Sequence, residues 1–202
     1  MCRMIPLLLA LALLACTSRP GPQVVVYCAL DQVYSEPVLR DFEKQTGIRV
    51  QARYDLEATK TSGLVNLLLA ERERPRCDVF WNNEMIQTQV LKEAGILDPY
   101  ISPSARTIPE EFKDPQGFWT GFAARIRVIL THRPSVGQDR PNSLKDLGDP
   151  RWKGRAAMAR PLFGTTLTHM VCLSQSQGPQ ALEALLRTVQ ENQVQILDGN
   201  SV

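Results

Sequence analysis

Polar side chains follow two predicted strands, at positions where a metal ion or a small ligand could bind. Asp31 comes directly after the apolar run that begins at Val24, and Asn83 and Glu84 follow a second run that ends at Trp81. Carboxylate oxygens are ligands for hard cations, and an amide can donate or accept hydrogen bonds. Each carboxylate also has a structural interpretation. Asp31 could shape the turn after its strand, and Glu84 could place a negative charge at the start of the next helix.

Gly164, Thr165 and Thr166 form a second group with binding chemistry, because they open a predicted helix. Glycine lets the backbone approach a ligand closely, and the first N–H groups of a helix have no partner within it. Together with two hydroxyl groups, these donors would make an anion site. The alternative is a threonine that caps the helix and binds nothing.

Three predicted strands would position the first group. The run 24–31 is rich in β-branched residues and typical of a buried strand, as is 77–81, whereas 48–54 alternates apolar and polar residues as an edge strand does. Ligands of open α/β sheets bind beyond the carboxyl ends of the strands. Right-handed crossovers predict a parallel sheet in which 24–31 lies between the other two strands.

Helices are predicted to connect these strands. Ser35 is expected to cap the first helix, which would stop at Gly47. The apolar stripe that this helix would bury consists of Val38, Leu39 and Phe42. Two further helices are expected over about 59–74 and 86–93, the former with Leu64, Leu67 and Leu68 directed inward.

The second half of the chain predicts another set of elements after an irregular, proline-rich connection over 98–117. They are a strand at 126–131, a short helix at 143–147, a strand at 156–159, a helix opened by 161–166, a helix from Pro179 and a strand at 194–197. Arg125 and Arg127 alternate and would face opposite sides of the chain, so one could reach an anionic ligand. A surface ion pair is the alternative for either side chain.

The first residues indicate an export signal. Arg3 precedes an apolar run of about a dozen residues, shorter than the ~20 residues needed to span a bilayer. The end of that run, LLAC, resembles the lipobox of bacterial lipoproteins. We therefore expect a signal peptide at 1–15, lipidation at Cys16, a lipidated tether at 16–23 and a membrane-anchored protein in the periplasm or at the cell surface. An ordinary signal with an incidental cysteine is the alternative.

Composition excludes several function classes. The chain has 23 basic and 21 acidic side chains and no basic run, so nucleic acid is not an expected partner. None of the sequence motifs of the common hydrolases, P-loop proteins or dinucleotide-binding enzymes is present, and we do not expect an enzyme. Cys28 ends one predicted strand and Cys77 begins another, so a disulfide between them is not expected.

Five segments in a fixed order carry a resemblance to a known family. They are VVVYCALDQVYSEPVLRDFEKQTGI, CDVFWNNE, WTGFAARIRVIL, DLGDPRWKGRAAMARPLFGTT and GNSV. The chain resembles the ferric-ion-binding group of extracellular solute-binding proteins, the substrate-binding components of ABC importers. The resemblance implies a class II periplasmic-binding-protein-like α/β fold with two lobes and a permease as partner. We expect a monomer whose first α/β lobe covers 24–121, with the crossover and a partial second lobe over 122–202.

The same resemblance implies roles for individual residues. Asp31 stands where the ferric binders place a histidine ligand, and Glu84 lies near a glutamate ligand of the family. The loop at Gly164, Thr165 and Thr166 would hold an anion that accompanies the metal. Asn83 and Asn200 would contact the same ligand, which would be ferric ion or a metal–anion complex; no resident cofactor is expected.

Family members run well beyond the GNSV segment, and the adjacent tyrosine ligands of the ferric binders lie in that later portion. We therefore expect an incomplete second lobe, a C-terminally truncated chain and weak or absent iron binding. Two alternatives remain open at this point. The chain could bind a small anionic organic ligand such as a phosphorylated compound, or it could be a non-functional remnant.

Overall fold

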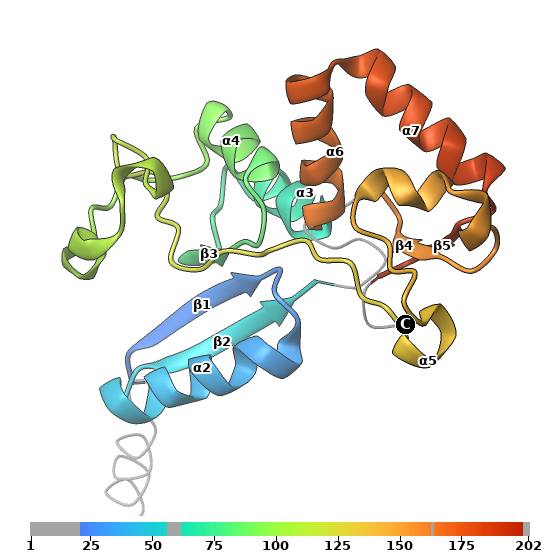
Figure 1. Cartoon of the computed structure of the whole chain (residues 1–202). Coiled ribbons are helices and arrows are strands. Elements are labelled where there is room, and N and C mark those ends of the chain that lie inside the picture. The colour runs from blue at the N-terminus through green and yellow to red at the C-terminus, as the bar shows by residue number, and fades with distance from the viewer. Residues whose placement is uncertain (1–20, 56–61, 163, 200–202) are drawn as a thin grey trace, which may run out of the picture.

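The computed structural model describes residues 21–55, 62–162 and 164–199. Two separate parallel sheets organise these residues (Figure 1). We refer to the elements around the three-stranded sheet as the first lobe and to those around the two-stranded sheet as the second lobe. The predicted signal segment 1–15, Cys16 and Asn200 lie outside the described residues.

The first lobe alternates strands and helices along the chain. Its elements are β1 (Gln23–Cys28), α2 (Gln32–Thr46), β2 (Arg49–Tyr54), α3 (Ser62–Ala70), β3 (Val79–Trp81) and α4 (Ile86–Glu93). The strands are parallel in the order β2-β1-β3, with Val24 opposite Val50 and Cys28 opposite Trp81. The predicted strand order is confirmed, with the β-branched strand between the other two.

The core of the first lobe lies on one face of its sheet, where β1 packs against α3 and α4. The buried residues of this cluster are Tyr27, Ala29, Leu64, Val65, Leu68 and Leu91. Leu64 and Leu68 face inward as predicted because they are one turn apart on α3, and Leu67 is partly buried against the same cluster. Burying a leucine side chain contributes about 1.5–3 kcal/mol, so this packing holds β1 firmly under both helices.

α2 begins earlier than predicted. Ser35 lies within the helix, fully buried, and its hydroxyl donates to the carbonyl oxygens of Leu30 and Asp31. The prediction that Ser35 caps the helix is wrong, because the chain turns into helix directly after β1 and the cap position falls at Asp31. Gly47 ends the helix as predicted, in a left-handed conformation at φ +71°.

The apolar stripe expected on α2 is only partly covered. Leu39 is half-buried, whereas the side chains of Val38 and Phe42 are 56% and 41% exposed. The predicted burial of Val38 and Phe42 is wrong. α2 packs mainly against β2, and this narrow contact covers only part of its apolar side.

The segment between the lobes contains short elements rather than long ones. It includes the 3₁₀ helices η2 (Pro103–Thr107) and η3 (Glu110–Phe112), followed by an antiparallel bridge between Lys113 and Thr120. The predicted irregular connection is therefore confirmed. The strand predicted at 126–131 is wrong, because residues 121–132 form neither helix nor strand, and Ile126 is 84% exposed. A β-branched run becomes a strand only beside a partner, and no described strand lies beside this one.

The second lobe is built on two short strands. Its elements are α5 (Arg133–Val136), η4 (Leu144–Gly148), η5 (Pro150–Trp152), β4 (Ala157–Ala159), α6 (Gly164–Gln177), α7 (Pro179–Glu191) and β5 (Gln195–Leu197). β4 and β5 are parallel, and α6 packs against α7. The strands and helices predicted after residue 143 are confirmed within one or two residues at their ends. None of the described helices combines the length and apolar character needed to cross a bilayer.

Candidate functional site

The carboxyl ends of β1 and β3 are held together by a polar loop. The side-chain amide of Asn83 donates to the carbonyl oxygen of Ala29 at 2.8 Å, and the backbone N–H of Ala29 donates to the carbonyl oxygen of Trp81 at 2.9 Å. The loops that carry Asp31 and Glu84 therefore leave the sheet side by side, as the parallel topology predicts. Asn83 serves as a connector between the strand ends, a role that its sequence position did not reveal.

Glu84 is the most enclosed of the predicted site residues in the first lobe. Its side chain is buried, and its two carboxylate oxygens accept the backbone N–H groups of Ile86 and Gln87 at 2.8 and 2.9 Å. These groups belong to the first turn of α4, whose N–H donors lack partners within the helix. The structure thus shows Glu84 in the helix-start role that the sequence had left open, and its role as a metal ligand stays a prediction.

Asn82, which the sequence places in the same polar loop, and Thr88, to which sequence reasoning assigned no role, support this arrangement. The side-chain amide of Asn82 donates to the Thr88 hydroxyl at 2.9 Å and to the backbone carbonyl oxygen of Glu84 at 2.7 Å. The Thr88 hydroxyl in turn donates to the Glu84 carbonyl oxygen at 2.9 Å. Glu84 and Thr88 are four positions apart, about one helical turn, and this spacing at a helix start was the signal available in the sequence.

The start of α6 reaches this loop from the second lobe. The hydroxyl of Thr168 donates to the Glu84 carboxylate at 3.4 Å and to the Gly164 carbonyl oxygen at the same distance. Figure 1 shows the start of α6 next to the first-lobe helices, between the two sheets. Thr168 is a contact between the lobes that the sequence analysis missed, because the two residues are 84 positions apart.

The three residues predicted to bind an anion all lie in the first turn of α6. Gly164 has φ +53°, a left-handed conformation that favours glycine, and a side chain added there would meet nothing within 4 Å. The space around the Cβ position of Gly164 is therefore open. Thr165 is half-buried, whereas Thr166 is 3% exposed and faces the interior with Met170, one turn further along the helix.

Asp31 lies beyond the carboxyl end of the central strand β1, at the cap position of α2. It is half-buried, and its carbonyl oxygen accepts the backbone N–H groups of Tyr34 and Ser35. In the described parts of the chain, no group of three or more His, Cys, Asp or Glu side chains is placed to hold a metal ion. The metal role predicted for Asp31 and Glu84 therefore stays a prediction.

Arg127 brings positive charge close to α6. Burial and, to a lesser degree, the neighbouring Arg125 lower the pKa of the Arg127 guanidinium. Burial and the charge of Arg127 also lower the pKa of His169 on α6. Arg127 thus lies close enough to α6 to act on His169, although the strand expected to carry it does not form; its contact with a ligand stays a prediction.

Trp81 lies against the segment that crosses between the lobes. Its ring meets that of Phe122 edge to face, with the ring centroids 5.5 Å apart. Phe122 itself is 67% exposed. This aromatic pair fixes the start of the crossing segment beside the end of β3.

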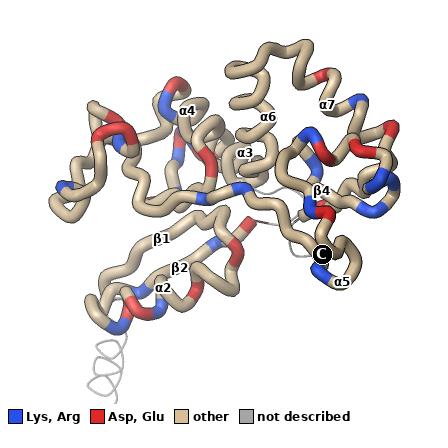
Figure 2. Tube along the Cα trace, in the orientation of Figure 1, with Lys and Arg blue, Asp and Glu red and all other residues tan. Residues whose placement is uncertain are grey.

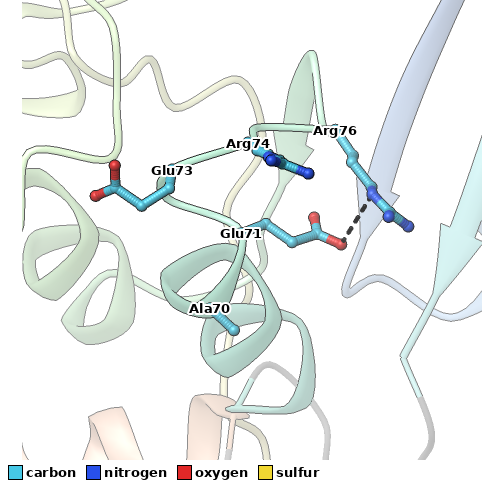
Figure 3. Close-up of a pocket in the computed structure, with 5 residues that line it drawn as sticks. All are labelled: Ala70, Glu71, Glu73, Arg74 and Arg76. Carbon is cyan, nitrogen blue, oxygen red and sulfur yellow. Dashed lines mark ion pairs between the residues drawn. The ribbon is translucent and has the colours of Figure 1, made fainter.

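A hollow of about 330 Å³ lies away from this edge, in the loop between α3 and β3 (Figure 3). The residues that line it are Ala70, Glu71, Glu73, Arg74 and Arg76. Glu71 points toward Arg76, with 4.0 Å between the charged atoms, and also accepts the Tyr27 hydroxyl at 2.8 Å. The hollow precedes β3 and so lies at the amino ends of the strands. It contains none of the predicted site residues.

Comparisons with known proteins agree with this fold. Residues 78–200 match the model of a family described as bacterial extracellular solute-binding protein. The chain is 31% identical over 139 residues to iron uptake protein A1 of Synechocystis, covering 67% of this chain and 38% of that protein. It is 27% identical over 170 residues to the Fe(3+)-binding periplasmic protein of Serratia marcescens, covering 84% of this chain and 49% of that one.

A solved structure shows the same architecture. The crystal structure of iron-bound HitA from Pseudomonas aeruginosa superposes with a TM-score of 0.80 at 24% identity, covering 89% of this chain and 57% of that chain. The predicted class II periplasmic-binding-protein fold is confirmed. The chain spans about half the length, or less, of the curated relatives it matches. With a family model matched over more than half of its residues, the chain belongs to the bacterial extracellular solute-binding proteins.

Proposed function

We propose that this chain serves as the substrate-binding component of an ABC importer and captures ferric ion, or a complex of ferric ion with a small anion, outside the inner membrane. Two similar proteins are named for iron uptake and Fe(3+) binding, and a similar solved structure holds iron. These two relatives are named as an uptake protein and a binding protein. A permease is the partner that would receive the ligand.

One observation supports the proposed location of the binding site. The contact between Thr168 and Glu84 brings the first turn of α6 to the carboxyl end of β3. A ligand between Asp31 and Gly164 would therefore meet oxygen ligands from one lobe and helix N–H donors from the other. Contacts from both lobes are what allow a ligand to favour a closed arrangement over an open one.

The remaining residue roles follow from this placement. Asp31 and Glu84 would supply carboxylate oxygens to the metal, and in this structure both oxygens of Glu84 accept backbone hydrogen bonds. Gly164, Thr165 and Thr166 would hold the anion, with Asn83 and Asn200 donating to the same ligand. Since the Thr166 side chain is buried, we expect its contribution to come from the backbone N–H group.

The cellular setting is part of the proposal. Lipidation at Cys16 would attach the mature chain to a membrane through a tether at 16–23, and the protein would act as a monomer beside its permease. The lobe boundaries 24–121 and 122–202 belong to the same proposal.

Titration calorimetry with ferric citrate and with inorganic phosphate tests the ligand. Because the tyrosine ligands of the ferric binders lie beyond this segment of the family, we expect low ferric affinity, which Asp31→Asn should lower further, and we expect Thr165→Val to weaken phosphate binding. The matched controls are Asp41→Asn and Thr107→Val, which change exposed residues of the same types elsewhere in the first half of the chain. Unchanged ferric affinity in Asp31→Asn would contradict the proposed metal ligand. Phosphate binding without ferric binding would point to an anionic ligand that carries no metal.

A further inference from the structure

Charge is distributed unevenly between the two halves of the chain. Residues 21–121 carry 11 basic and 15 acidic side chains, a net charge of −4, whereas residues 122–202 carry 10 and 6, a net charge of +4. The net charge of the whole chain is close to zero and therefore does not reveal this difference between the two halves. Opposite net charges on the two lobes produce a field that can orient the protein as it approaches a charged partner.

Exposed basic side chains gather on one part of the second lobe. We call this group the arginine surface; its members are Arg133, Arg140, Arg151, Lys153 and Arg155, and all five are exposed. Figure 2 shows basic positions at α5 and on neighbouring loops of the second lobe. Two acidic residues, Asp139 and Asp149, lie among them and pair with Arg151.

Contacts between two segments of the chain hold the arginine surface together. The Arg155 guanidinium donates to the carbonyl oxygen of Ser135 in α5 at 2.7 Å. Arg151 meets Asp139 at 3.7 Å, so the loop that carries Arg140 lies beside η5. These contacts connect residues 133–140 to residues 150–155.

The buried ring of Trp152 anchors the same surface. The guanidinium carbon of Arg155 lies 5.3 Å from the ring centroid and that of Arg151 lies 6.0 Å from it. Such cation–π contacts restrain side chains that would otherwise move freely. The arginine surface is therefore partly ordered before any partner arrives, which lowers the entropic cost of docking.

We infer that the arginine surface docks on an acidic protein surface of the importer permease; this inference depends on the function proposed above. Arg133, Arg140 and Lys153 form no ion pair within the described residues, so their charges are available to a partner. Four of the five members are arginines, whose planar fork matches a carboxylate with two hydrogen bonds. Arg151 already shows this geometry within the chain, because its Nε donates to Oδ1 of Asp149 at 3.1 Å and its Nη2 donates to Oδ2 at 2.6 Å.

The test uses the full chain and the permease–ATPase complex in nanodiscs of zwitterionic phosphatidylcholine. Association is measured at low and at physiological salt for the unmodified protein and for the triple variant Arg133→Gln/Arg140→Gln/Lys153→Gln. The matched control is Lys44→Gln/Arg74→Gln/Arg106→Gln, which removes three exposed charges from the first half of the chain. Vesicles of phosphatidylglycerol without permease form the lipid arm.

We expect the triple variant to associate about 10-fold or more slowly at low salt and to lose most of its salt dependence, because electrostatic steering acts mainly on the association rate. The control variant should stay within about twofold of the unmodified protein. Equal association of the triple variant and the unmodified protein would overturn the inference and leave the proposed function standing. Tight binding of the unmodified protein to phosphatidylglycerol vesicles, lost in the triple variant, would overturn it in favour of a lipid surface. Absence of permease binding by the unmodified protein would overturn both the docking surface and the proposed importer partner.

Discussion

Replacement of Glu84 separates a structural role at the helix start from a role in ligand binding. The Glu84 carboxylate is buried and accepts two backbone N–H groups of α4, at 2.8 and 2.9 Å. Glu84→Ala removes both acceptors and leaves the two donors without their partners. Glu84→Gln keeps one acceptor oxygen but removes the negative charge that favours the positive end of the helix.

The expected loss of stability follows from these hydrogen bonds. Loss of a helix-cap acceptor costs about 0.5–2 kcal/mol, and a hydrogen bond to a charged group contributes about 1.5–3 kcal/mol. We expect the free energy of unfolding to fall by about 2–3 kcal/mol in Glu84→Ala and by about 1 kcal/mol in Glu84→Gln. For a chain of this size, about 1 kcal/mol corresponds to roughly 2–4 °C in the melting temperature.

Urea unfolding followed by circular dichroism measures these differences without added ligand. Glu93→Ala is the control, because Glu93 is exposed at the last residue of the same helix, where a negative charge is not favoured. A Glu84→Ala protein within about 0.5 kcal/mol of the unmodified protein would refute the helix-start role. A Glu84→Gln protein that is more stable than the unmodified protein would show that the carboxylate is held at a cost for a ligand.

Four further predictions concern single residues elsewhere in the chain. Contact with Lys92 lowers the pKa of Asp114, so the ionised Asp114 stabilises the fold above the ordinary aspartate pKa of about 4. This stabilisation is lost as the pH falls through the lower pKa of Asp114 in the folded protein. Asp114→Asn should therefore flatten the acid side of a plot of unfolding free energy against pH. Gly164→Ala should cost about 1–2 kcal/mol in urea unfolding because φ is +53° there, and an unchanged midpoint would contradict that conformation. Burial raises the pKa of the Cys28 thiol, so iodoacetamide at pH 8 should label the exposed Cys172 first, as peptide mass spectrometry would show; preferential labelling of Cys28 would contradict its burial. Cys16→Ser should abolish detergent partitioning and globomycin-sensitive processing, and unchanged partitioning would exclude lipidation at this residue.

Local pattern determined much of the first lobe. The β-branched run of β1 and the alternation in β2 predicted both strands, and right-handed crossovers then left one strand order. Gly47 ended its helix as expected, since glycine adopts the left-handed conformation without steric cost. The elements of the second lobe after residue 143 were predictable for the same reason, because their periodicity and helix-start residues are local signals.

The residues at the candidate site could be named from sequence, but their contacts could not. Position after a strand identified Asp31, Asn83 and Glu84, because chain direction alone places such residues at the carboxyl edge. Whether Glu84 faces a ligand or the helix start depends on the path of its own loop. The Thr168–Glu84 contact joins residues 84 positions apart and was invisible to any local pattern.

Only the tertiary structure decided which apolar side chains are buried. Residues 126–131 and the α2 stripe carry a strong hydrophobic pattern, yet Ile126 and Val38 are 84% and 56% exposed. A hydrophobic pattern indicates which side chains a segment could bury against another element. Whether those side chains are buried depends on which other segments of the fold lie close enough to contact them. The arginine surface has the same origin, because its charges lie on two separate segments that only folding brings together.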